Sequence, residues 1–196
     1  ERAKKNKAKI KYIFETHIHA DFVSGHLDLA KKTAATIVFG PNANTHYDCY
    51  NAADGETFKI GSLTLKVIHT PGHTLESVSY LLIDANGKNH ALFSGDTLFL
   101  GDVGIPDVAQ QYKNLSKEKL AELLFESLRS KIMPLEDNII LYPAHGAGSA
   151  CGKNMSKETI GTLGDQKSSN YALRSDMTKG EFVSEVIKDI GSPPPY

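Results

Sequence analysis

Four short apolar runs in this chain each lead into side chains that can bind a metal ion. The runs cover residues 10–16, 63–69, 91–94 and 139–142. The side chains that follow them are His17, His19, Asp21, His73, Asp96 and His145. Apolar, β-branched runs are typical of buried strands, and a loop at the end of a strand can hold a polar group over a rigid base. Because imidazole and carboxylate suit iron or zinc, the four runs together predict a single metal site.

Size, charge and cysteine usage indicate one domain that acts on a small molecule. A chain of 196 residues, 40% of them apolar, is long enough to bury a single core. The 22 basic and 23 acidic residues are interspersed apart from a lysine cluster at residues 4–11, so we expect no nucleic-acid partner and no membrane. No apolar stretch approaches the ~20 residues of a membrane helix. Cys49 and Cys151 form no Cys-x-x-Cys pattern, which favours reduced thiols and a cytoplasmic location.

The rest of the pattern predicts grouped strands with helices on their outer faces. Further strands are expected at residues 37–39, 57–60 and 77–83, and the middle of the chain is expected to be antiparallel sheet. Helices are expected at residues 24–32, 116–133, 156–170 and 178–190. Ser116 is an N-cap candidate, Thr178 and Glu181 form a capping box, and Gly191 is the expected stop of the last helix. This order indicates a layered α/β or α+β sandwich.

Four motifs carry a resemblance to a known family. His-x-His-x-Asp begins at His17, and Pro-Gly-His-Thr, Ser-Gly-Asp-Thr and Pro-Ala-His-Gly contain His73, Asp96 and His145. Their order and spacing resemble the metallo-β-lactamase superfamily of αββα sandwiches, and the resemblance covers nearly the whole chain. It implies an α+β fold with one such domain over residues 1–190. Only sixteen residues precede His17, so we expect the sandwich to lack its first N-terminal strands and to expose a sheet edge.

The chain departs from the superfamily pattern at Phe22. The first motif of the family usually ends in a histidine here, and because phenylalanine cannot bind a metal, a mononuclear site is favoured. A first motif without this histidine is similar to that of the persulfide dioxygenases, which are related to glyoxalase II. The resemblance implies one Fe(II) per chain, held by His17, His73 and Asp96, although a purified sample can hold zinc. It also implies oxidation of a low-molecular-weight persulfide by O2 to thiol and sulfite, because such a triad leaves room for substrate and dioxygen side by side.

The side chains around this triad are expected to support metal binding and catalysis. We expect Asp21 and His145 to act in catalysis by orienting ligands or bound water, and direct ligation by His19 stays open. In the same branch an arginine is common where Ile105 stands, so a contact to an anionic substrate is in doubt. The other histidines carry less weight as ligands. His26 is expected on a helix surface, His69 at a polar strand end, and His46 and His90 at the surface or in turns.

The segment around Cys151 resembles persulfide dioxygenases that are fused to rhodanese domains. The Cys151 thiol would lie near the iron and could relay sulfur if its pKa is lowered. The alternative is a small buried hydrophobic residue, and Cys49 is expected to be structural. Residues 191–196 are Pro-rich and would form a linker to a rhodanese domain outside this chain. We expect the partners to be a thiol persulfide, O2 and further copies of the chain in a homo-oligomer.

Two other functions compete with the dioxygenase. A glyoxalase II-like hydrolase would use its metal to hydrolyse a thioester, and Phe22 is the feature against it. A truncated, inactive domain would serve only as a scaffold for a sulfurtransferase partner. Metal content distinguishes the three, since they predict one iron, two zincs or no metal.

Overall fold

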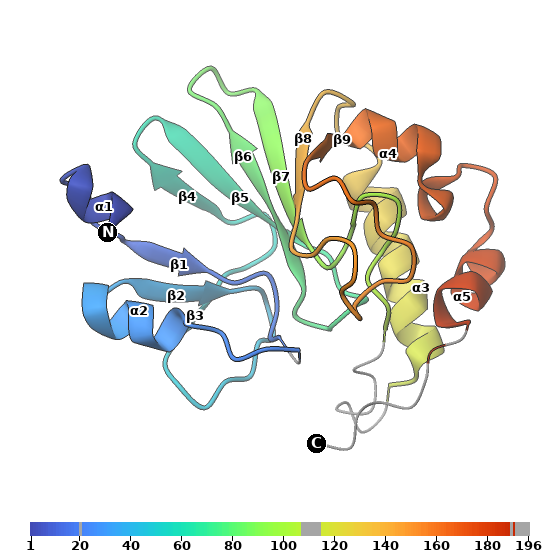
Figure 1. The fold of residues 1–196 in the computed structure, drawn as a ribbon, viewed down its shortest axis with the longest axis horizontal. Helices are drawn as coiled ribbons and strands as arrows, with labels where there is room; N and C mark the ends of the chain where they lie inside the picture. Colours follow the sequence, from blue (N-terminus) through green and yellow to red (C-terminus); the bar gives the residue numbers. More distant parts are fainter. Residues whose placement is uncertain (20, 107–114, 189, 191–196) are drawn as a thin grey trace.

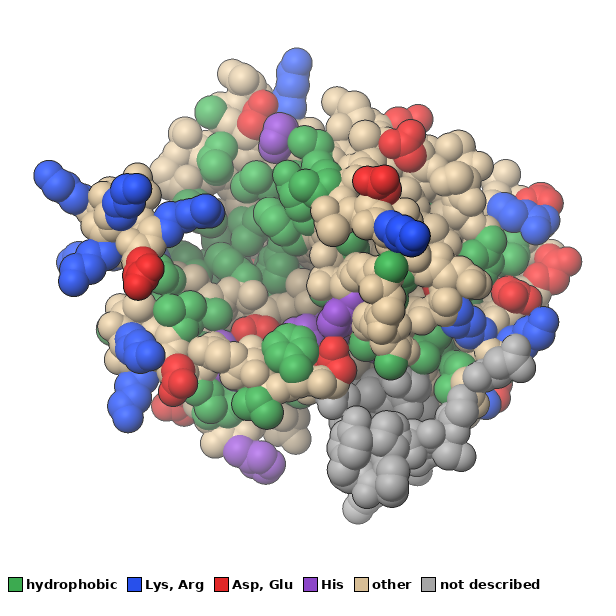
Figure 2. Space-filling model, viewed as in Figure 1, with side chains coloured by type: hydrophobic (Ala, Val, Ile, Leu, Met, Phe, Trp, Pro, Cys, Tyr) green, Lys and Arg blue, Asp and Glu red, His purple; other side chains and the backbone are tan. Residues whose placement is uncertain are grey.

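The computed structural model describes residues 1–19, 21–106, 115–188 and 190, and it has the predicted sandwich of two sheets with helices on the outer faces (Figure 1). The layers run from α2 through the small sheet and the large sheet to α3, α4 and α5. A short helix that was not predicted, α1 (Arg2–Lys5), precedes the first strand. Exposed basic side chains gather around α1 and form the predicted lysine cluster (Figure 2).

The small sheet has three parallel strands in the order β1-β2-β3. Its elements are β1 (Tyr12–Phe14), β2 (Thr36–Phe39) and β3 (Tyr50–Asn51), with α2 (His26–Thr33) between β1 and β2. The predicted helix and the strand that follows it are confirmed, each within two residues of its expected bounds. The two-residue strand β3 was missed, because a segment this short carries no alternation of apolar and polar residues.

The large sheet has six strands in sequence order, antiparallel except for the parallel pair β7 and β8. They are β4 (Thr57–Ile60), β5 (Leu63–His69), β6 (Val78–Ile83), β7 (Asn89–Gly95), β8 (Ile140–Pro143) and β9 (Gly161–Thr162). The antiparallel middle is therefore confirmed. Gly61 has a φ of 61°, which glycine adopts without strain, and it makes the tight turn between β4 and β5.

Helices cover the outer face of the large sheet (Figure 1). They are α3 (Lys117–Ser127), which continues as a π-helical turn (Leu128–Ile132), α4 (Leu163–Ser169), a 3-10 turn (Tyr171–Leu173) and α5 (Lys179–Ile187). Ser116 accepts a hydrogen bond from the Lys119 N–H, and both halves of the Thr178–Glu181 capping box are present. Both predicted N-termini are confirmed.

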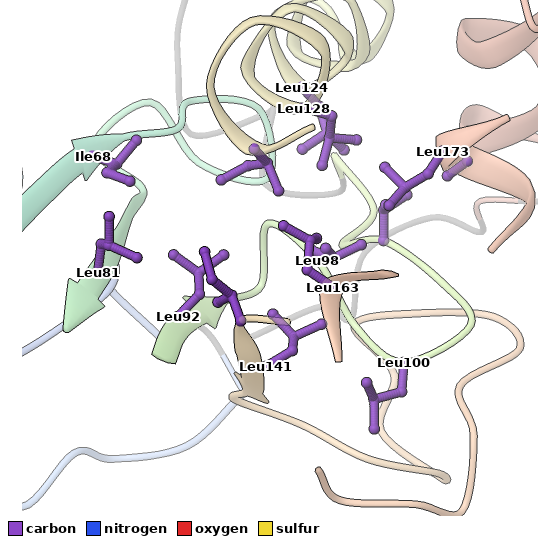
Figure 3. Close-up of a cluster of buried hydrophobic side chains, with 14 of the residues drawn as sticks. Ile68, Leu81, Leu92, Leu98, Leu100, Leu124, Leu128, Leu141, Leu163 and Leu173 are labelled. Carbon is purple, nitrogen blue, oxygen red and sulfur yellow. The ribbon is translucent and has the colours of Figure 1, made fainter. Parts of the chain in front are cut away.

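The main core lies between this helical layer and the large sheet. Leucines from α3 and from the π-helical turn meet leucines from β6, β7 and β8, as Figure 3 shows for Leu81, Leu92, Leu124, Leu128 and Leu141. Burying one such side chain contributes roughly 1.5–3 kcal/mol. A second core fills the space between the two sheets. The rings of Phe14 and Phe58 meet edge to face there, with their centroids 5.1 Å apart.

Two predicted helices are shorter than expected. Residues 156–160 are not helical, because Thr162 pairs with Ile140 in the sheet and its side chain then caps α4. The last helix ends at Ile187, since Lys188 has an extended ψ of 135°. Gly191 and the predicted linker at 191–196 lie outside the described residues. No described helix is long and apolar enough to cross a membrane.

Candidate metal centre

The side chains predicted to form a metal site come together in the fold. They are carried by the loops that follow β1, β5, β7 and β8. The ligand-type atoms of His17, His73 and Asp96 lie within 4.8 Å of one another, as do those of His19, Asp21 and His145. Histidine side chains are visible near the middle of the face in Figure 2. Six side chains separated by up to 128 residues of sequence thus form two adjacent groups.

The first group, His17, His73 and Asp96, is buried, with exposures of 2%, 4% and 2%. The Asp96 Oδ2 atom lies 3.8 Å from His17 Nε2 and 3.5 Å from His73 Nε2. Neither oxygen of Asp96 has a hydrogen-bond partner in the described part of the chain. A buried carboxylate without hydrogen-bond partners is strongly unfavourable unless a cation compensates it. The donor set therefore fits a divalent metal, although the role of each side chain as a ligand stays a prediction.

The backbone after β7 fixes the orientation of His73. The Nδ1–H group of His73 donates a hydrogen bond of 2.7 Å to the carbonyl of Ile105, which leaves Nε2 facing Asp96. Gly104 permits this approach, because a Cβ atom there would lie 2.0 Å from the Asp96 carbonyl oxygen and 3.2 Å from His73 Cγ. The sequence alone indicates only that Ile105 stands where an arginine is common in this branch. In the structure its backbone carbonyl acts on the site.

The protonation states of the first group suit metal binding. Burial, and then the neighbouring His73, His19 and His145, together lower the pKa of His17 from 6.5 to about 2. His17 is therefore neutral at physiological pH, the form in which imidazole binds a metal. Burial raises the pKa of Asp96, against the lowering effect of His73 and His145. A cation between these groups would favour the ionised carboxylate.

The second group, His19, Asp21 and His145, adjoins the first and is more exposed. The His145 Nε2 atom lies 3.4 Å from both Asp21 Oδ2 and Asp96 Oδ2, so it links the two groups. His19 Nδ1 lies 3.7 Å from Asp21 Oδ1. Within the described residues, His19 Nδ1 and His145 Nε2 are buried without a hydrogen-bond partner. His19 thus groups with Asp21 and His145 and not with the buried triad.

Phe22 and Glu15 lie against His19. The ring of Phe22 is 51% exposed, and its centroid is 4.4 Å from that of His19. Glu15 Oε2 lies 3.7 Å from His19 Nε2, and Glu15 Oε1 lies 3.1 Å from His26 Nδ1. His26 is the first residue of α2 and belongs to neither group, in agreement with its predicted place on a helix, and Glu15 and Ser24 contact its ring. The sequence signal that was missed is Glu15, an acidic residue just before the histidine motif.

The structure places Cys151 beside the metal site. It is 7% exposed, and its sulfur lies within 4.8 Å of ligand-type atoms of Asp96 and His145. Burial, and then the charge of Asp96, raises the pKa of the Cys151 thiol to about 12. The lowered pKa that a sulfur relay needs is absent here, so the alternative of a protonated, buried thiol is favoured. Sulfur transfer at Cys151 stays a prediction.

The remaining candidates lie away from both groups. His46 and His90 are exposed, as predicted. His69 Nε2 is hydrogen-bonded to the carbonyl of Leu75 at 2.8 Å, which agrees with a polar position at a strand end. The sulfur of Cys49 is 3.3 Å from the hydroxyl of Thr45, consistent with a structural role.

The fold and the site together define an α+β sandwich with a candidate metal centre, and comparisons with known proteins identify the family. No family model matches the chain. "Glyoxylase B2" of Dictyostelium discoideum is 32% identical, over 92% of this chain and 63% of its own length. A hydroxyacylglutathione hydrolase of Rhodopseudomonas palustris (strain HaA2) is 30% identical, over 93% of this chain and 79% of its own length.

Solved structures agree with this assignment. A metallo-β-lactamase from Staphylococcus aureus subsp. aureus COL matches with a TM-score of 0.86 and 36% identity, over 98% of this chain and 57% of that one. ETHE1 from Myxococcus xanthus matches with a TM-score of 0.77 and 25% identity, over 99% of this chain and 75% of that one. The chain belongs to the metallo-β-lactamase superfamily, within its glyoxalase II (hydroxyacylglutathione hydrolase)-like group. It spans less than two thirds of the Dictyostelium and Staphylococcus proteins.

Proposed function

We propose that the chain is a metal-dependent enzyme whose substrate is a conjugate of glutathione or a similar low-molecular-weight thiol. The observation that carries this proposal is the buried group of His17, His73 and Asp96, in which two carboxylate oxygens have no hydrogen-bond partner among the described residues. The relatives named hydroxyacylglutathione hydrolase support the thiol part of the substrate.

Each side chain has a defined task in this proposal. His17, His73 and Asp96 would hold the metal, and the Ile105 carbonyl keeps His73 in the tautomer that presents Nε2. The bound metal would supply Lewis-acid chemistry to a hydrolase or, as ferrous iron, redox chemistry with dioxygen. In a chain that holds one metal ion, His145 would stay free of metal and would pass a proton between Asp21 and Asp96, whose Oδ2 atoms each lie 3.4 Å from its Nε2.

The first candidate reaction is hydrolysis of a thioester. The names of the curated relatives support this reaction better than they support a dioxygenase. The second group of His19, Asp21 and His145 contacts Asp96 through His145. The two groups together offer most of the side chains that a site for two metal ions needs. In this reaction water is added across the thioester bond, and a carboxylic acid and a free thiol leave.

The second candidate reaction is oxidation of a persulfide, and Phe22 is the specific observation in its favour. Phe22 offers no donor to the second group, which leaves that group at three ligands and more exposed than the first. A single ferrous ion on two histidines and a carboxylate then suits dioxygen chemistry. Persulfide, dioxygen and water give thiol, sulfite and two protons.

One set of assays separates the candidates. Metal-free protein is loaded with Fe(II) without oxygen, or with Zn(II), and each form is given S-lactoylglutathione and glutathione persulfide. Oxygen uptake with sulfite formation by the iron form alone supports persulfide oxidation, and thioester cleavage without oxygen supports hydrolysis. D96N should lose either activity. Protein that binds neither metal would contradict the proposal and support the scaffold alternative.

The expected assembly and partners of the chain are further proposals. The resemblance implies a rhodanese domain in a longer polypeptide, and we also propose that the domain self-associates. Light scattering of the purified chain tests self-association, and the mass of the native polypeptide tests the fusion. A mass equal to this chain alone would contradict the fusion.

A further inference from the structure

A second buried acid lies next to the metal ligands without belonging to either group. Glu76 comes three residues after His73 and is 3% exposed. Its Oε1 atom accepts a hydrogen bond of 3.0 Å from the backbone N–H of Ile18. Ile18 is the residue between His17 and His19. The Glu76 side chain therefore joins the loop of His73 to the loop that carries the two other histidines.

The loop that carries Glu76 is held rigidly by its own hydrogen bonds. The Thr70 N–H donates to the Ser77 carbonyl at 2.8 Å, which closes the base of the loop. Within it, the hydroxyls of Thr74 and Ser77 are 2.6 Å apart. Gly40 lets this loop pack closely, because a Cβ atom there would lie 2.4 Å from the Glu76 carbonyl oxygen. Glu76 and His73 are thus in a fixed relation to each other.

A second contact between the same two loops brackets His17. The Val78 N–H donates a hydrogen bond of 2.8 Å to the Thr16 carbonyl, one residue before His17. The Glu76 contact lies one residue after His17. The backbone on both sides of His17 is therefore attached to the segment that begins at His73. These two contacts set the separation of the two imidazoles.

We infer that Glu76 is a positioning residue that aligns the His17 loop with His73 for metal binding. This inference rests on the proposed metal-dependent function. A carboxylate acceptor is suited to the task because a hydrogen bond to an ionised group is about twice as strong as a neutral one. The competing explanation is that Glu76 supports folding alone. The two explanations differ in whether loss of the hydrogen bond changes the metal site itself.

The test compares variants that keep or remove the acceptor. E76Q retains a side-chain oxygen for the Ile18 N–H, whereas E76M has a similar length and no acceptor. E181M is the matched control, because Glu181 also accepts a backbone N–H, that of Thr178 at 2.8 Å, but at the start of α5. For each protein we would measure Co(II) affinity by chelator competition, the visible spectrum of the Co(II) form and the unfolding temperature of the metal-free form.

The expected result is that E76M binds Co(II) about 10- to 100-fold more weakly than wild type, with a shifted spectrum. E76Q should lie between wild type and E76M, because its neutral oxygen keeps a weaker hydrogen bond to the Ile18 N–H. E181M should lose unfolding temperature while its affinity and spectrum stay unchanged. If E76M fails to fold, E76D replaces it, since aspartate keeps the charge and is too short to reach Ile18. Wild-type affinity and spectrum in E76M or E76D, or equal losses in E76Q and E76M, would overturn the inference. A wild-type chain that binds no Co(II) would overturn the proposed function instead.

Discussion

Replacing Phe22 with histidine tests whether this position limits the site to one metal ion. In the structure the Phe22 ring lies over His19, next to the group of His19, Asp21 and His145. An imidazole at this position would add a fourth donor to that group. We expect F22H to bind two metal ions per chain where wild type binds one.

The exposure of Phe22 determines how much unfolding free energy the F22H substitution removes. Full burial of a phenylalanine side chain contributes roughly 1.5–3 kcal/mol, and Phe22 is 51% exposed, so metal-free F22H should lose only about 1 kcal/mol of unfolding free energy. With metal at 100 times the dissociation constant of the new site, binding should add about 2.7 kcal/mol. The variant should therefore be slightly less stable than wild type without metal and more stable with it.

The assay is metal stoichiometry by mass spectrometry after zinc loading and desalting, together with urea unfolding in both states. F22L is the control, because it keeps an apolar side chain and adds no donor. Thioester hydrolysis is measured on the same samples and should rise only in F22H. A wild-type chain that already holds two ions, or an F22H chain that still holds one, would refute the reasoning.

Three further predictions follow from the structure. The His17 pKa of about 2 in the folded chain lies below the usual 6.5, so metal-free protein should lose about 1.4 kcal/mol of unfolding free energy per unit as pH falls below 6.5. Urea unfolding from pH 7 to 5 checks this, and a flat profile would contradict it. G104A should weaken metal binding more than ~10-fold, because its Cβ would displace Asp96 and His73; unchanged affinity in a chelator competition would show that this backbone can move without loss. T178A should lose about 1 kcal/mol by urea unfolding with metal affinity intact, and a change in affinity would mean that α5 acts on the site.

The parts of the fold that depend on local sequence were predictable. Leu120, Leu124 and Leu128 recur at helical spacing, and all three are fully buried in or just after α3. The Thr178–Glu181 capping box is a local motif and forms as expected. The non-helical segment before α4 was not predictable, because it depends on pairing of Thr162 with Ile140 from a distant part of the chain.

The candidate metal centre likewise has features that the local sequence predicts and features that depend on the fold. His17, His73 and Asp96 could be found as candidates from the sequence because each follows a strand, and the ends of these strands from the two sheets meet at one edge of the sandwich. The surroundings of His19 and His26 depend on the conformation of one loop, and the periodicity of apolar residues does not predict that conformation. The contact between Glu76 and Ile18 joins residues 58 positions apart, so only the fold reveals it.

The most direct test of the metal site is a crystal structure of the chain loaded with Fe(II) or Zn(II), with data collected at the absorption edge of that metal. We predict an anomalous peak within about 2.0–2.2 Å of His17 Nε2, His73 Nε2 and an oxygen of Asp96. A peak elsewhere, or no peak at this position at saturating metal, would contradict the proposal that these three side chains share one ion.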